Sequence, residues 1–251
     1  MERSVASPEI SVIVPCYNEG AILDESVALA VREIGRVAPS FEIILCNDGS
    51  TDDTGAVMDR LAERYSNVRS VGYSQNRGAG YAFRRGLTNA TGKVVMHMDA
   101  DLAMHPRDVC NTLLPLLADH EIAIASRYRG VKAQYPLRRR IPSHIYRAIY
   151  RFLLGLPIYD AMSGFFAFRR EVLDRIEPLR SDGFEVYLEL FLKAKLCGCR
   201  IAEVGVEFRH QTESGEVSVL AYAPKQLMNT LRIWRTVRLA SAASRAAARP
   251  D

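Results

Sequence analysis

The feature that most constrains the fold is a regular alternation, in the first half of the chain, of short apolar runs with longer amphipathic stretches. The apolar runs are ISVIVP (10–15), FEIILC (41–46), VRSVGY (68–73), VVMHM (94–98) and IAIAS (122–126). The stretches between them, near 21–36, 54–65, 79–90 and 106–118, have helical spacing. Strands that are apolar throughout are typical of a parallel sheet covered on both faces. The pattern predicts an α/β fold with a mostly parallel sheet flanked by helices.

The second half of the chain, from about Arg127, has a different pattern. After a basic and aromatic stretch (135–154) we expect a strand, a helix, a strand and a basic helix, at GFFAFR (164–169), FEVYLELFLKAKL (184–196), RIAEVGVEF (200–208) and roughly 224–240. No internal repeat and no linker rich in Gly, Pro or Ser separates the two halves. A single domain over residues 1–251 is therefore expected.

Composition excludes several classes of protein. Hydrophobic residues make up 48% and charged residues 25% of the chain, which is typical of a globular protein rather than a disordered one. No apolar run approaches the roughly 18 residues that cross a bilayer, and MERSVASPEI lacks the apolar core of a secretory signal, so we expect a cytoplasmic protein. Five scattered cysteines indicate neither a disulfide framework nor a zinc site.

The net charge of +4 is unevenly distributed. Residues 132–151 carry six basic side chains and no acidic one, and residues 224–251 carry six basic and one acidic, so the rest of the chain is net acidic. This does not fit a general nucleic-acid binder. Apolar residues recur at helical spacing in both basic segments, which is typical of helices at a membrane surface. The alternative is that the first segment packs on the sheet and the second mediates a dimer.

Two carboxylates follow the apolar run VVMHM directly, in the sequence Asp99-Ala100-Asp101. Side chains two apart on an extended strand project to the same side, with Cα atoms roughly 6.5–7 Å apart. Such a pair suits Mg²⁺ or Mn²⁺ carrying a diphosphate, because these ions take one or two protein carboxylates plus phosphate oxygens and water. The alternative is a solvated turn ahead of a helix that begins near Pro106.

Polar turns also follow the first two apolar runs. Asn47-Asp48-Gly49-Ser50 could offer a carboxylate to a base or ribose, or form a turn that caps the next helix. Pro15-Cys16-Tyr17-Asn18-Glu19 could offer an aromatic face and a carboxylate to a nucleobase, or be a plain loop. Ligands of open α/β sheets bind beyond the carboxyl ends of the strands, so the three turns together predict a nucleotide pocket.

These motifs resemble a known family in order and spacing. The segments IVPCYNE, ILCNDGSTDD, NRGAGYAFRRGLTNATG, VVMHMDADL and ASRY are similar to those of the family-2 inverting glycosyltransferases with the GT-A (Rossmann-like) fold. DAMSGFFAFRREVL (160–173) and DGFEVYLELFLKA (182–194) resemble the dolichol-phosphate mannosyltransferase and polyprenyl-phosphate glycosyltransferase branch. The resemblance covers roughly residues 10–220.

The resemblance implies transfer of a hexose from a nucleotide-sugar donor, with inversion at the anomeric carbon. It implies that Pro15, Tyr17, Glu19 and Asp48 hold the nucleoside, that Asp99, Ala100 and Asp101 form the metal and diphosphate motif, and that Arg127 approaches the diphosphate. It also divides the domain into a nucleotide-sugar-binding half (about 8–127), an acceptor half (about 128–222) and a basic C-terminal helix and tail (about 223–251).

The acceptor is less constrained than the donor. A lipid phosphate is already anionic near neutral pH and needs positioning, whereas a hydroxyl needs a carboxylate to take its proton. Asp160 matches an acidic position of the family and is a candidate catalytic residue that orients or activates the acceptor; the alternative is that it pairs with a nearby arginine. Asp101, in the metal motif, is the other candidate catalytic residue. Glu185 and Glu189 share a helix face, and we expect that face to be solvated or salt-bridged.

Two positions depart from the branch pattern. Ala103 stands where a metal-ligating Gln is common, and the stretch 209–219 lacks the lysine of a Gly-x-Ser-Lys turn, leaving Arg209 and His210 as phosphate contacts. Other nucleotide-binding classes are not supported, since Phe83 occupies the third glycine position of a dinucleotide fingerprint and no phosphate-binding GxxxxGK[ST] loop is present.

The sequence therefore predicts a metal-dependent inverting hexosyltransferase that uses a GDP-mannose or UDP-glucose type of donor and a polyprenyl phosphate acceptor. Peripheral contact with the inner face of the cytoplasmic membrane is expected, with a membrane-protein partner or a homodimer as open alternatives. The same fold acting on a hydroxyl acceptor, or a non-catalytic nucleotide-sugar-binding subunit, are the other functions that the motifs allow.

Overall fold

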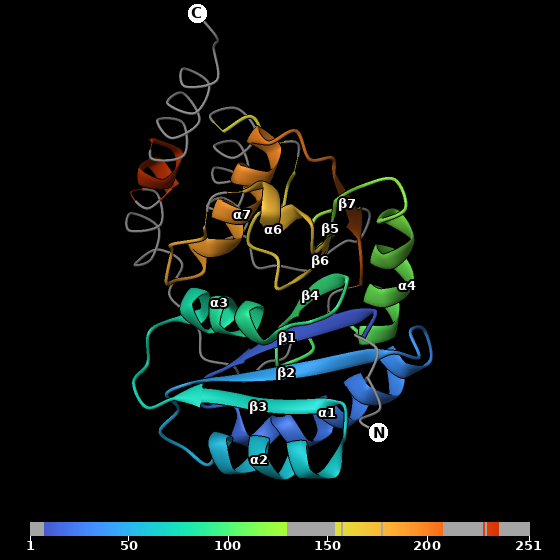
Figure 1. Ribbon diagram of the computed structural model, residues 1–251, viewed down its shortest axis with the longest axis vertical. Coiled ribbons are helices and arrows are strands. Elements are labelled where there is room, and N and C mark those ends of the chain that lie inside the picture. Colours follow the sequence, from blue (N-terminus) through green and yellow to red (C-terminus); the bar gives the residue numbers. More distant parts are fainter. Residues whose placement is uncertain are drawn as a thin grey trace, which may run out of the picture.

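A twisted β-sheet forms the centre of the molecule (Figure 1). The computed structural model describes residues 8–129, 154–156, 158–176, 178–207, 228 and 230–235. Within them, seven strands form one sheet of order β3-β2-β1-β4-β6-β5-β7. They are β1 (Ile10–Cys16), β2 (Phe41–Asp48), β3 (Val68–Tyr73), β4 (Val94–Met98), β5 (Ile122–Ser126), β6 (Phe165–Arg169) and β7 (Ile201–Gly205).

The sheet is mostly parallel, as the alternating sequence pattern predicted. β1 pairs in parallel with β2 and β4, β2 pairs in parallel with β3, and β5 pairs in parallel with β7. β6 runs antiparallel to both β4 and β5, with Phe165 opposite Met98. The reversed strand therefore begins at the edge of the sheet where its neighbours end.

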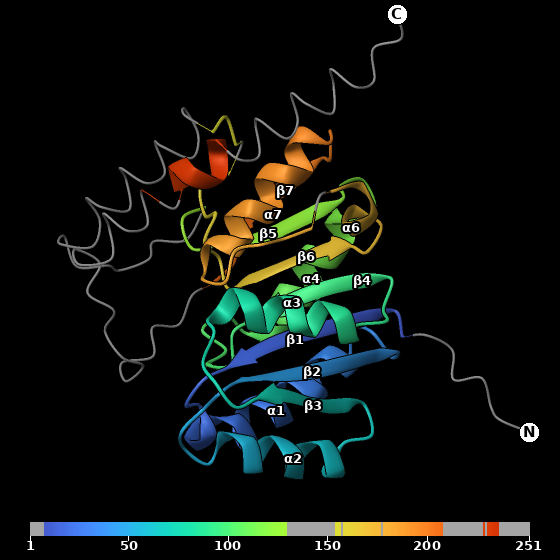
Figure 2. The same ribbon diagram turned by 60° about the vertical axis from the view of Figure 1, so that its left-hand side comes forward.

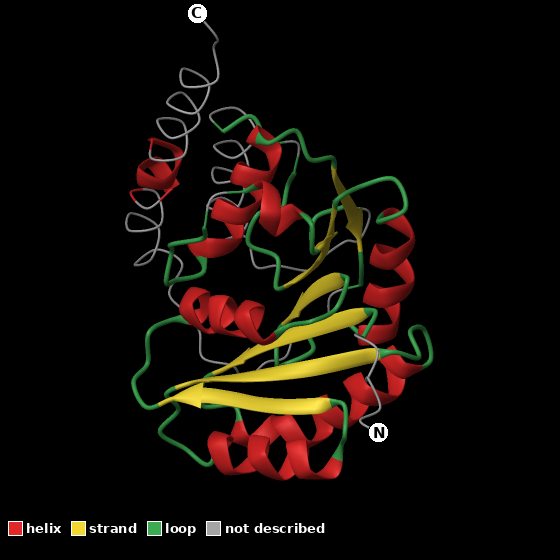
Figure 3. Ribbon diagram, in the orientation of Figure 1, coloured by secondary structure: helices red, strands yellow, loops and turns green. Residues whose placement is uncertain are grey.

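Helices cover both faces of the sheet (Figures 2 and 3). One face carries α1 (Gly20–Gly35), α2 (Thr54–Arg64) and α4 (Pro106–Leu116). The other carries α3 (Ala79–Asn89), α6 (Val172–Arg175) and α7 (Glu185–Leu196). Alternate side chains along a strand point to opposite faces of the sheet. Val12 and Val14 therefore pack toward α1, while Ile13 packs toward α3.

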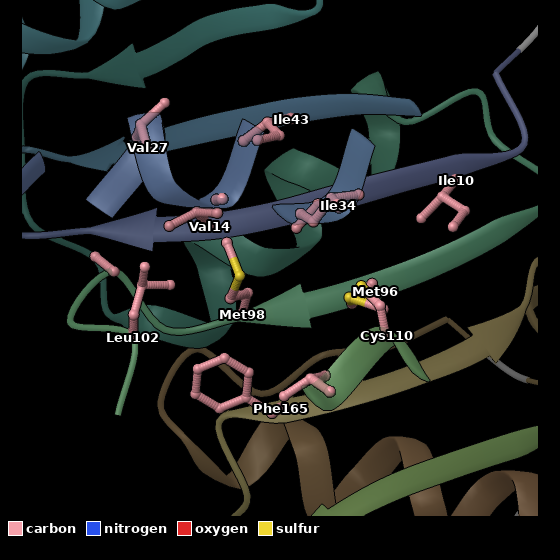
Figure 4. Close-up of a cluster of buried hydrophobic side chains, with 14 of the residues drawn as sticks. Ile10, Val14, Val27, Ile34, Ile43, Met96, Met98, Leu102, Cys110 and Phe165 are labelled. Carbon is pink, nitrogen blue, oxygen red and sulfur yellow. The ribbon is translucent and has the colours of Figure 1, made fainter. Parts of the chain in front are cut away.

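The core under α1 and α4 extends to the edge where β1 and β4 end. Figure 4 shows Val14, Met98 and Leu102 gathered there beneath the turn that follows β4. Leu102 is 8% exposed although it lies in that turn. Each Å² of apolar surface buried here contributes about 25 cal/mol to the free energy of folding. This packing fixes the backbone that carries the neighbouring carboxylates.

Several predicted boundaries need correction. β2 continues to Asp48, so Asp48 is the last strand residue, opposite Tyr73, rather than part of a turn. The strand predicted over 200–208 ends at Gly205, and the short helix α6 was not predicted. The four helices of the first half begin and end within two residues of the predicted limits. Of the helix predicted near 224–240, the described residues 228 and 230–235 are helical.

Candidate active site

Charged side chains gather at the edge where β1, β2, β4 and β5 end. Asp99 and Asp101 follow β4, and Glu19 follows β1. Arg127 follows β5, and Asp160 lies shortly before the reversed strand β6. Asp99 senses the charges of Asp101, Arg127, Glu19 and Asp160, so segments far apart in the sequence converge on it.

Asp99 lies against the backbone of Gly164. The amide N–H of Asp99 donates to the carbonyl oxygen of Gly164 at 3.2 Å, and a Cβ added to Gly164 would lie 1.5 Å from Oδ2 of Asp99. A side chain at position 164 is therefore incompatible with this carboxylate. Burial raises the pKa of Asp99 to about 7, the charge of Asp101 adds to that rise, and Arg127 opposes it.

Asp101 is held in a tight turn whose apolar residues are buried. Its Oδ1 accepts the backbone N–H of Ala103 at 3.0 Å, and the N–H of Leu102 donates to the carbonyl of Asp99 at 3.3 Å. Leu102 has φ +50°, a left-handed conformation that is unusual for a leucine and is held by its buried side chain. Ala100 and Ala103 are 5% and 6% exposed, whereas Asp99 and Asp101 are half-buried, so the turn is only partly solvated.

The turn after β1 is tied to the turn after β2. Asn18 has φ +55°, its N–H donates to Oγ of Ser50 at 3.1 Å, and its Oδ1 accepts the N–H of Thr51 at 2.8 Å. The Glu19 N–H donates to Oγ1 of Thr54 at 2.9 Å. These bonds fix the backbone on both sides of Glu19.

The same turn presents an aromatic ring and an acid at the edge of the sheet. Tyr17 is 46% exposed, Pro15 is half-buried, and Glu19 is half-buried with its carboxyl toward the Asp101 charge. Burial, followed by the charges of Asp101 and Asp52, raises the pKa of Glu19. The turn offers an accessible ring beside a carboxyl, the arrangement that the sequence predicted for a nucleoside.

Asp48 has a structural task in addition to any contact with a ligand. Its carboxylate accepts from the Tyr73 hydroxyl at 2.7 Å, from Nδ2 of Asn76 at 3.1 Å, and from the backbone N–H groups of Arg77 and Gly78, each at 2.8 Å. Burial and this hydrogen bond raise the pKa of Tyr73. Asp48 thus holds the loop between β3 and α3, while its predicted contact with a nucleoside stays a prediction.

Asp160 pairs with Arg127. Its Oδ2 accepts the backbone N–H and the Nε–H of Arg127 at 3.1 and 2.8 Å, and its Oδ1 accepts Nη2–H at 2.7 Å. Nη2 also donates to the carbonyl of Met162 at 3.2 Å. The side chain of Asp160 is 2% exposed and that of Arg127 is 26% exposed. The arginine-pairing alternative is therefore present, and a direct role of Asp160 toward the acceptor stays a prediction.

Glu203, which sequence reasoning did not select, fixes the backbone that carries Asp160 of this ion pair. It lies in the middle of β7 and is 1% exposed, and its Oε1 accepts the backbone N–H groups of Tyr159 and Asp160 at 3.0 and 2.8 Å. Arg129 Nε lies 3.3 Å from Oε2. The available signal was an acidic residue inside the apolar run RIAEVGVEF, where burial requires a partner.

A buried polar pair was also missed. His97, in β4, and Tyr187, in α7, lie on the layer opposite α1 and are 0% and 2% exposed. The Tyr187 hydroxyl lies 2.6 Å from Nε2 of His97, and Nδ1 lies 2.8 Å from the Gly164 carbonyl oxygen. Burial lowers the pKa of His97 to about 4, against the bond to Gly164, so the ring is neutral at neutral pH. The signal was a lone histidine in VVMHM.

Glu189 corrects the expectation of a solvated helix face. It is 4% exposed, pairs with Lys193 at 2.7 Å, and accepts the backbone N–H groups of Arg180 and Ser181 at 3.1 and 2.9 Å. Its salt bridge was one of the expected forms, whereas its burial was not. Glu189 anchors the loop before α7, which in turn contacts the start of α3 through the Asp182 carbonyl and the N–H of Gly80 at 2.7 Å.

The acidic residues fit a divalent cation shared with a ligand. Among the described residues no group of three or more His, Cys, Asp or Glu side chains is set to enclose a metal ion. Asp99 and Asp101 instead offer carboxylate oxygens, the donors that Mg²⁺ and Mn²⁺ prefer, at a place where burial, followed by the charge of Asp101, raises the pKa of Asp99. A cation would relieve that repulsion, and a diphosphate would complete its ligands.

Several expectations fall on residues outside the described part of the chain. They include Arg209, His210 and the basic segment at 132–151, and most of the second basic segment. Within the described residues, no helix is both long enough and apolar enough to span a membrane. All five cysteines are free thiols.

Comparisons with known proteins bear on the same residues. Residues 11–177 match the family described as Glycosyl transferase family 2. The chain is 32% identical to polyprenol monophosphomannose synthase of Mycolicibacterium smegmatis over 205 residues, covering 78% of this chain and 76% of the relative. It is 29% identical to glycosyltransferase AglD of Haloferax volcanii over 210 residues, covering 82% of this chain but 34% of AglD. The chain thus spans about a third of that relative's length.

The fold is shared with a solved enzyme. The crystal structure of glucosyl-3-phosphoglycerate synthase from Mycobacterium tuberculosis, in complex with Mn²⁺, uridine diphosphate and glucosyl-3-phosphoglycerate, matches with a TM-score of 0.64 and 25% identity. The match covers 90% of this chain and 79% of that one. The α/β architecture of this chain is therefore shared with an enzyme solved in complex with Mn²⁺ and uridine diphosphate.

Proposed function

The chain belongs to glycosyl transferase family 2, and from this membership we propose that it transfers a hexose from a nucleoside-diphosphate sugar to a polyprenyl phosphate, with inversion at the anomeric carbon. The donor is of the GDP-mannose or UDP-glucose type. The polyprenyl acceptor is supported by the relative named polyprenol monophosphomannose synthase, over three quarters of which this chain aligns. The nucleotide-sugar half is 8–127 and the acceptor half 128–222.

The observation that carries the proposal is the pair Asp99 and Asp101 at the end of β4, with Glu19 and Arg127 close enough to act on the pKa of Asp99. Two carboxylates beside an arginine suit the diphosphate of a nucleotide sugar. Mg²⁺ or Mn²⁺ held by Asp99 and Asp101 would supply Lewis-acid stabilisation of the diphosphate leaving group. The related crystal structure, a complex with Mn²⁺ and uridine diphosphate, supports that assignment.

Other residues of the edge have distinct tasks in this proposal. The exposed ring of Tyr17 stacks on the base, and Glu19 with Pro15 borders the nucleoside. Asp48 shapes the loop at the start of α3 and reaches the nucleoside from the same edge. Arg127, fixed by Asp160, directs its charge at the diphosphate, where negative charge grows as the glycosidic bond breaks.

The acceptor is a phosphate rather than a hydroxyl in this proposal. A phosphate oxygen is anionic at neutral pH and attacks the anomeric carbon without giving up a proton, so the reaction requires orientation and not a base. The burial and pairing of Asp160 support this choice, because its side chain is 2% exposed and is oriented by Arg127, so it is poorly placed to reach a hydroxyl and take its proton. The hydroxyl-acceptor alternative and the non-catalytic subunit are not favoured.

Peripheral contact with a membrane surface forms part of the proposal. A polyprenyl phosphate resides in a bilayer, and the basic segments at 132–151 and 224–251 carry the charge that anionic lipid headgroups attract. A membrane-protein partner or a homodimer would bring the site to the lipid equally well. Flotation with vesicles of anionic lipid tests the first of these routes.

Donor binding tests the proposal at its base. Titration calorimetry of the full chain with GDP and UDP, each with and without Mn²⁺ or Mg²⁺, should find one nucleotide that binds only when the metal is present. Asp101→Asn should weaken that binding by at least tenfold, because one of two carboxylates is lost. Asp59→Asn, on the exposed face of α2, is the control. Metal-independent binding, unchanged in Asp101→Asn, would contradict the assignment.

A further inference from the structure

We propose that His97 and Tyr187 form a positioning pair that sets the carboxylate of Asp99 for the donor and its cation, acting through Gly164. The proposal rests on the function proposed above, since it concerns the same metal and diphosphate site. Neither side chain is a catalytic residue here, because neither reaches the edge of the sheet where the charged side chains gather. Both lie in the core beneath it.

The pair forms a continuous chain of hydrogen bonds that ends at Asp99. The Tyr187 hydroxyl donates to Nε2 of His97 at 2.6 Å, and Nδ1–H donates to the Gly164 carbonyl at 2.8 Å. The same carbonyl accepts the N–H of Asp99 at 3.2 Å. α7 is thereby linked to the turn after β4, across the start of β6.

Gly164, held by this hydrogen-bond chain, determines where the carboxylate of Asp99 lies. The side chain of Asp99 is so close to the Gly164 Cα that an added Cβ would lie 1.5 Å from Oδ2 and 2.6 Å from Oδ1. The carboxylate therefore rests on the glycine backbone. Any displacement of the Gly164 peptide, which the imidazole holds, displaces the surface against which Asp99 lies.

Packing alone does not explain these two polar side chains. His97 is stacked on Phe166 with ring centroids 5.0 Å apart and is edge-on to Phe83 at 5.4 Å, and Tyr187 contacts both phenylalanines. An apolar side chain would fill this aromatic cluster without the desolvation cost of an imidazole. The hydrogen bond to Gly164 is what an apolar residue could not provide.

Two substitutions of His97 separate positioning from packing. His97→Asn places an amide N–H where Nδ1–H was and can keep the hydrogen bond to Gly164. It fills less space, however, and loses the hydrogen bond to the Tyr187 hydroxyl. His97→Leu fills the space but has no donor. Binding of Mn²⁺ with UDP or GDP is measured on the full chain by electron paramagnetic resonance of free Mn²⁺, and stability by thermal unfolding.

The two variants should rank in opposite order in the two measurements: His97→Asn should bind Mn²⁺ with nucleotide more tightly, and His97→Leu should unfold at the higher temperature. His97→Leu should weaken Mn²⁺–nucleotide binding about tenfold or more, the usual range for a group that orients a metal ligand. His97→Asn should bind within about threefold of the wild type while unfolding at the lower temperature of the two. Phe191→Leu, which disturbs the packing on Phe166 without touching a hydrogen bond of the chain, should lower stability and leave binding unchanged.

Equal Mn²⁺–nucleotide affinity in the wild type and His97→Leu would overturn the positioning role. If the Leu variant does not fold, Tyr187→Phe takes its place: it should weaken binding about two- to threefold in the wild type and have no effect in His97→Asn, which has already lost the same hydrogen bond, and equal binding of Tyr187→Phe and the wild type would overturn the role. Absence of Mn²⁺–nucleotide binding in the wild type would instead refute the proposed donor site itself, and the positioning role with it.

Discussion

Arg127 and Asp160 meet in a two-point ion pair, with Nε–H on one carboxylate oxygen at 2.8 Å and Nη2–H on the other at 2.7 Å. The acid is buried and the arginine is partly exposed. Glu203 fixes the backbone of Asp160 from the opposite side, at 2.8 Å. The carboxylate is therefore placed to aim the guanidinium, and the guanidinium is the group that can reach a ligand.

Asp160→Asn should accordingly impair turnover without changing its pH dependence. Loss of the carboxylate charge releases the guanidinium of Arg127. It should lower kcat/KM about a hundredfold, as does removal of one oriented hydrogen-bond donor that stabilises a transition state. In this account Asp160 transfers no proton, so the pH–rate profile of Asp160→Asn should have the same shape as that of the wild type. Loss in the variant of an acidic limb that the wild type shows would identify Asp160 as a general base. Glu189→Gln, which breaks another buried pair, controls for lost stability.

Gly164→Ala should weaken donor binding through Asp99. The added methyl would overlap Oδ2 of Asp99 at 1.5 Å, so the carboxylate must rotate away from the position that we assign to the cation. Affinity for the metal–nucleotide complex, measured by titration calorimetry, should fall at least tenfold. Gly35→Ala, whose methyl would meet Phe41 at an ordinary 3.4 Å, should bind like the wild type. Unchanged affinity in Gly164→Ala would show that Asp99 is not a ligand.

Asp48→Asn should destabilise the loop between β3 and α3. An amide NH₂ would replace an oxygen that accepts backbone N–H groups of Arg77 and Gly78, leaving donors facing donors. The free energy of unfolding in urea should fall by about 2 kcal/mol, the cost of buried unsatisfied groups. Hydrogen exchange of the Arg77 and Gly78 amides should accelerate. Slow exchange retained at both amides would mean that the loop does not depend on Asp48.

Acid should destabilise the protein through His97. Burial lowers its pKa from 6.5 to about 4, so between these values the unfolded chain binds more protons than the folded one. The stability contributed by the neutral ring is complete above pH 6.5 and is lost as the pH falls toward 4. From pH 7.5 to pH 5 the loss is about 2 kcal/mol.

The pH effect is isolated by comparison with His97→Asn, whose amide does not titrate and can keep the bond to Gly164. Asp99, whose raised pKa has the opposite effect on stability, keeps its surroundings in this variant, so its titration cancels in the difference. Urea unfolding at pH 7.5 and pH 5 should therefore show the advantage of the wild type over the variant shrinking by about 2 kcal/mol at the lower pH. The same difference at both pH values would mean that folding does not lower the pKa of His97.

The strands and the acidic pair were predictable from local sequence. Apolar runs such as ISVIVP specify buried parallel strands, and Asp99 and Asp101 follow directly from the end of one of them. The partners of three buried polar residues were not predictable, because they lie far away in the sequence. Gly164 lies 67 residues from His97, Arg127 lies 33 residues from Asp160, and the Tyr159 amide lies 44 residues from Glu203. Only the insertion of β6 between β4 and β5 brings these residues together.

Transfer to a defined lipid is the most direct test of the account. The full chain is incubated with UDP-glucose or GDP-mannose, Mn²⁺ or Mg²⁺, and a short polyprenyl phosphate in detergent, with the matching polyprenol as control. We predict a polyprenyl phosphate hexose, seen by mass spectrometry, whose anomeric configuration by NMR is opposite to that of the donor, and no product from the polyprenol. Glycosylation of the polyprenol, or a retained anomeric configuration, would contradict the central claim.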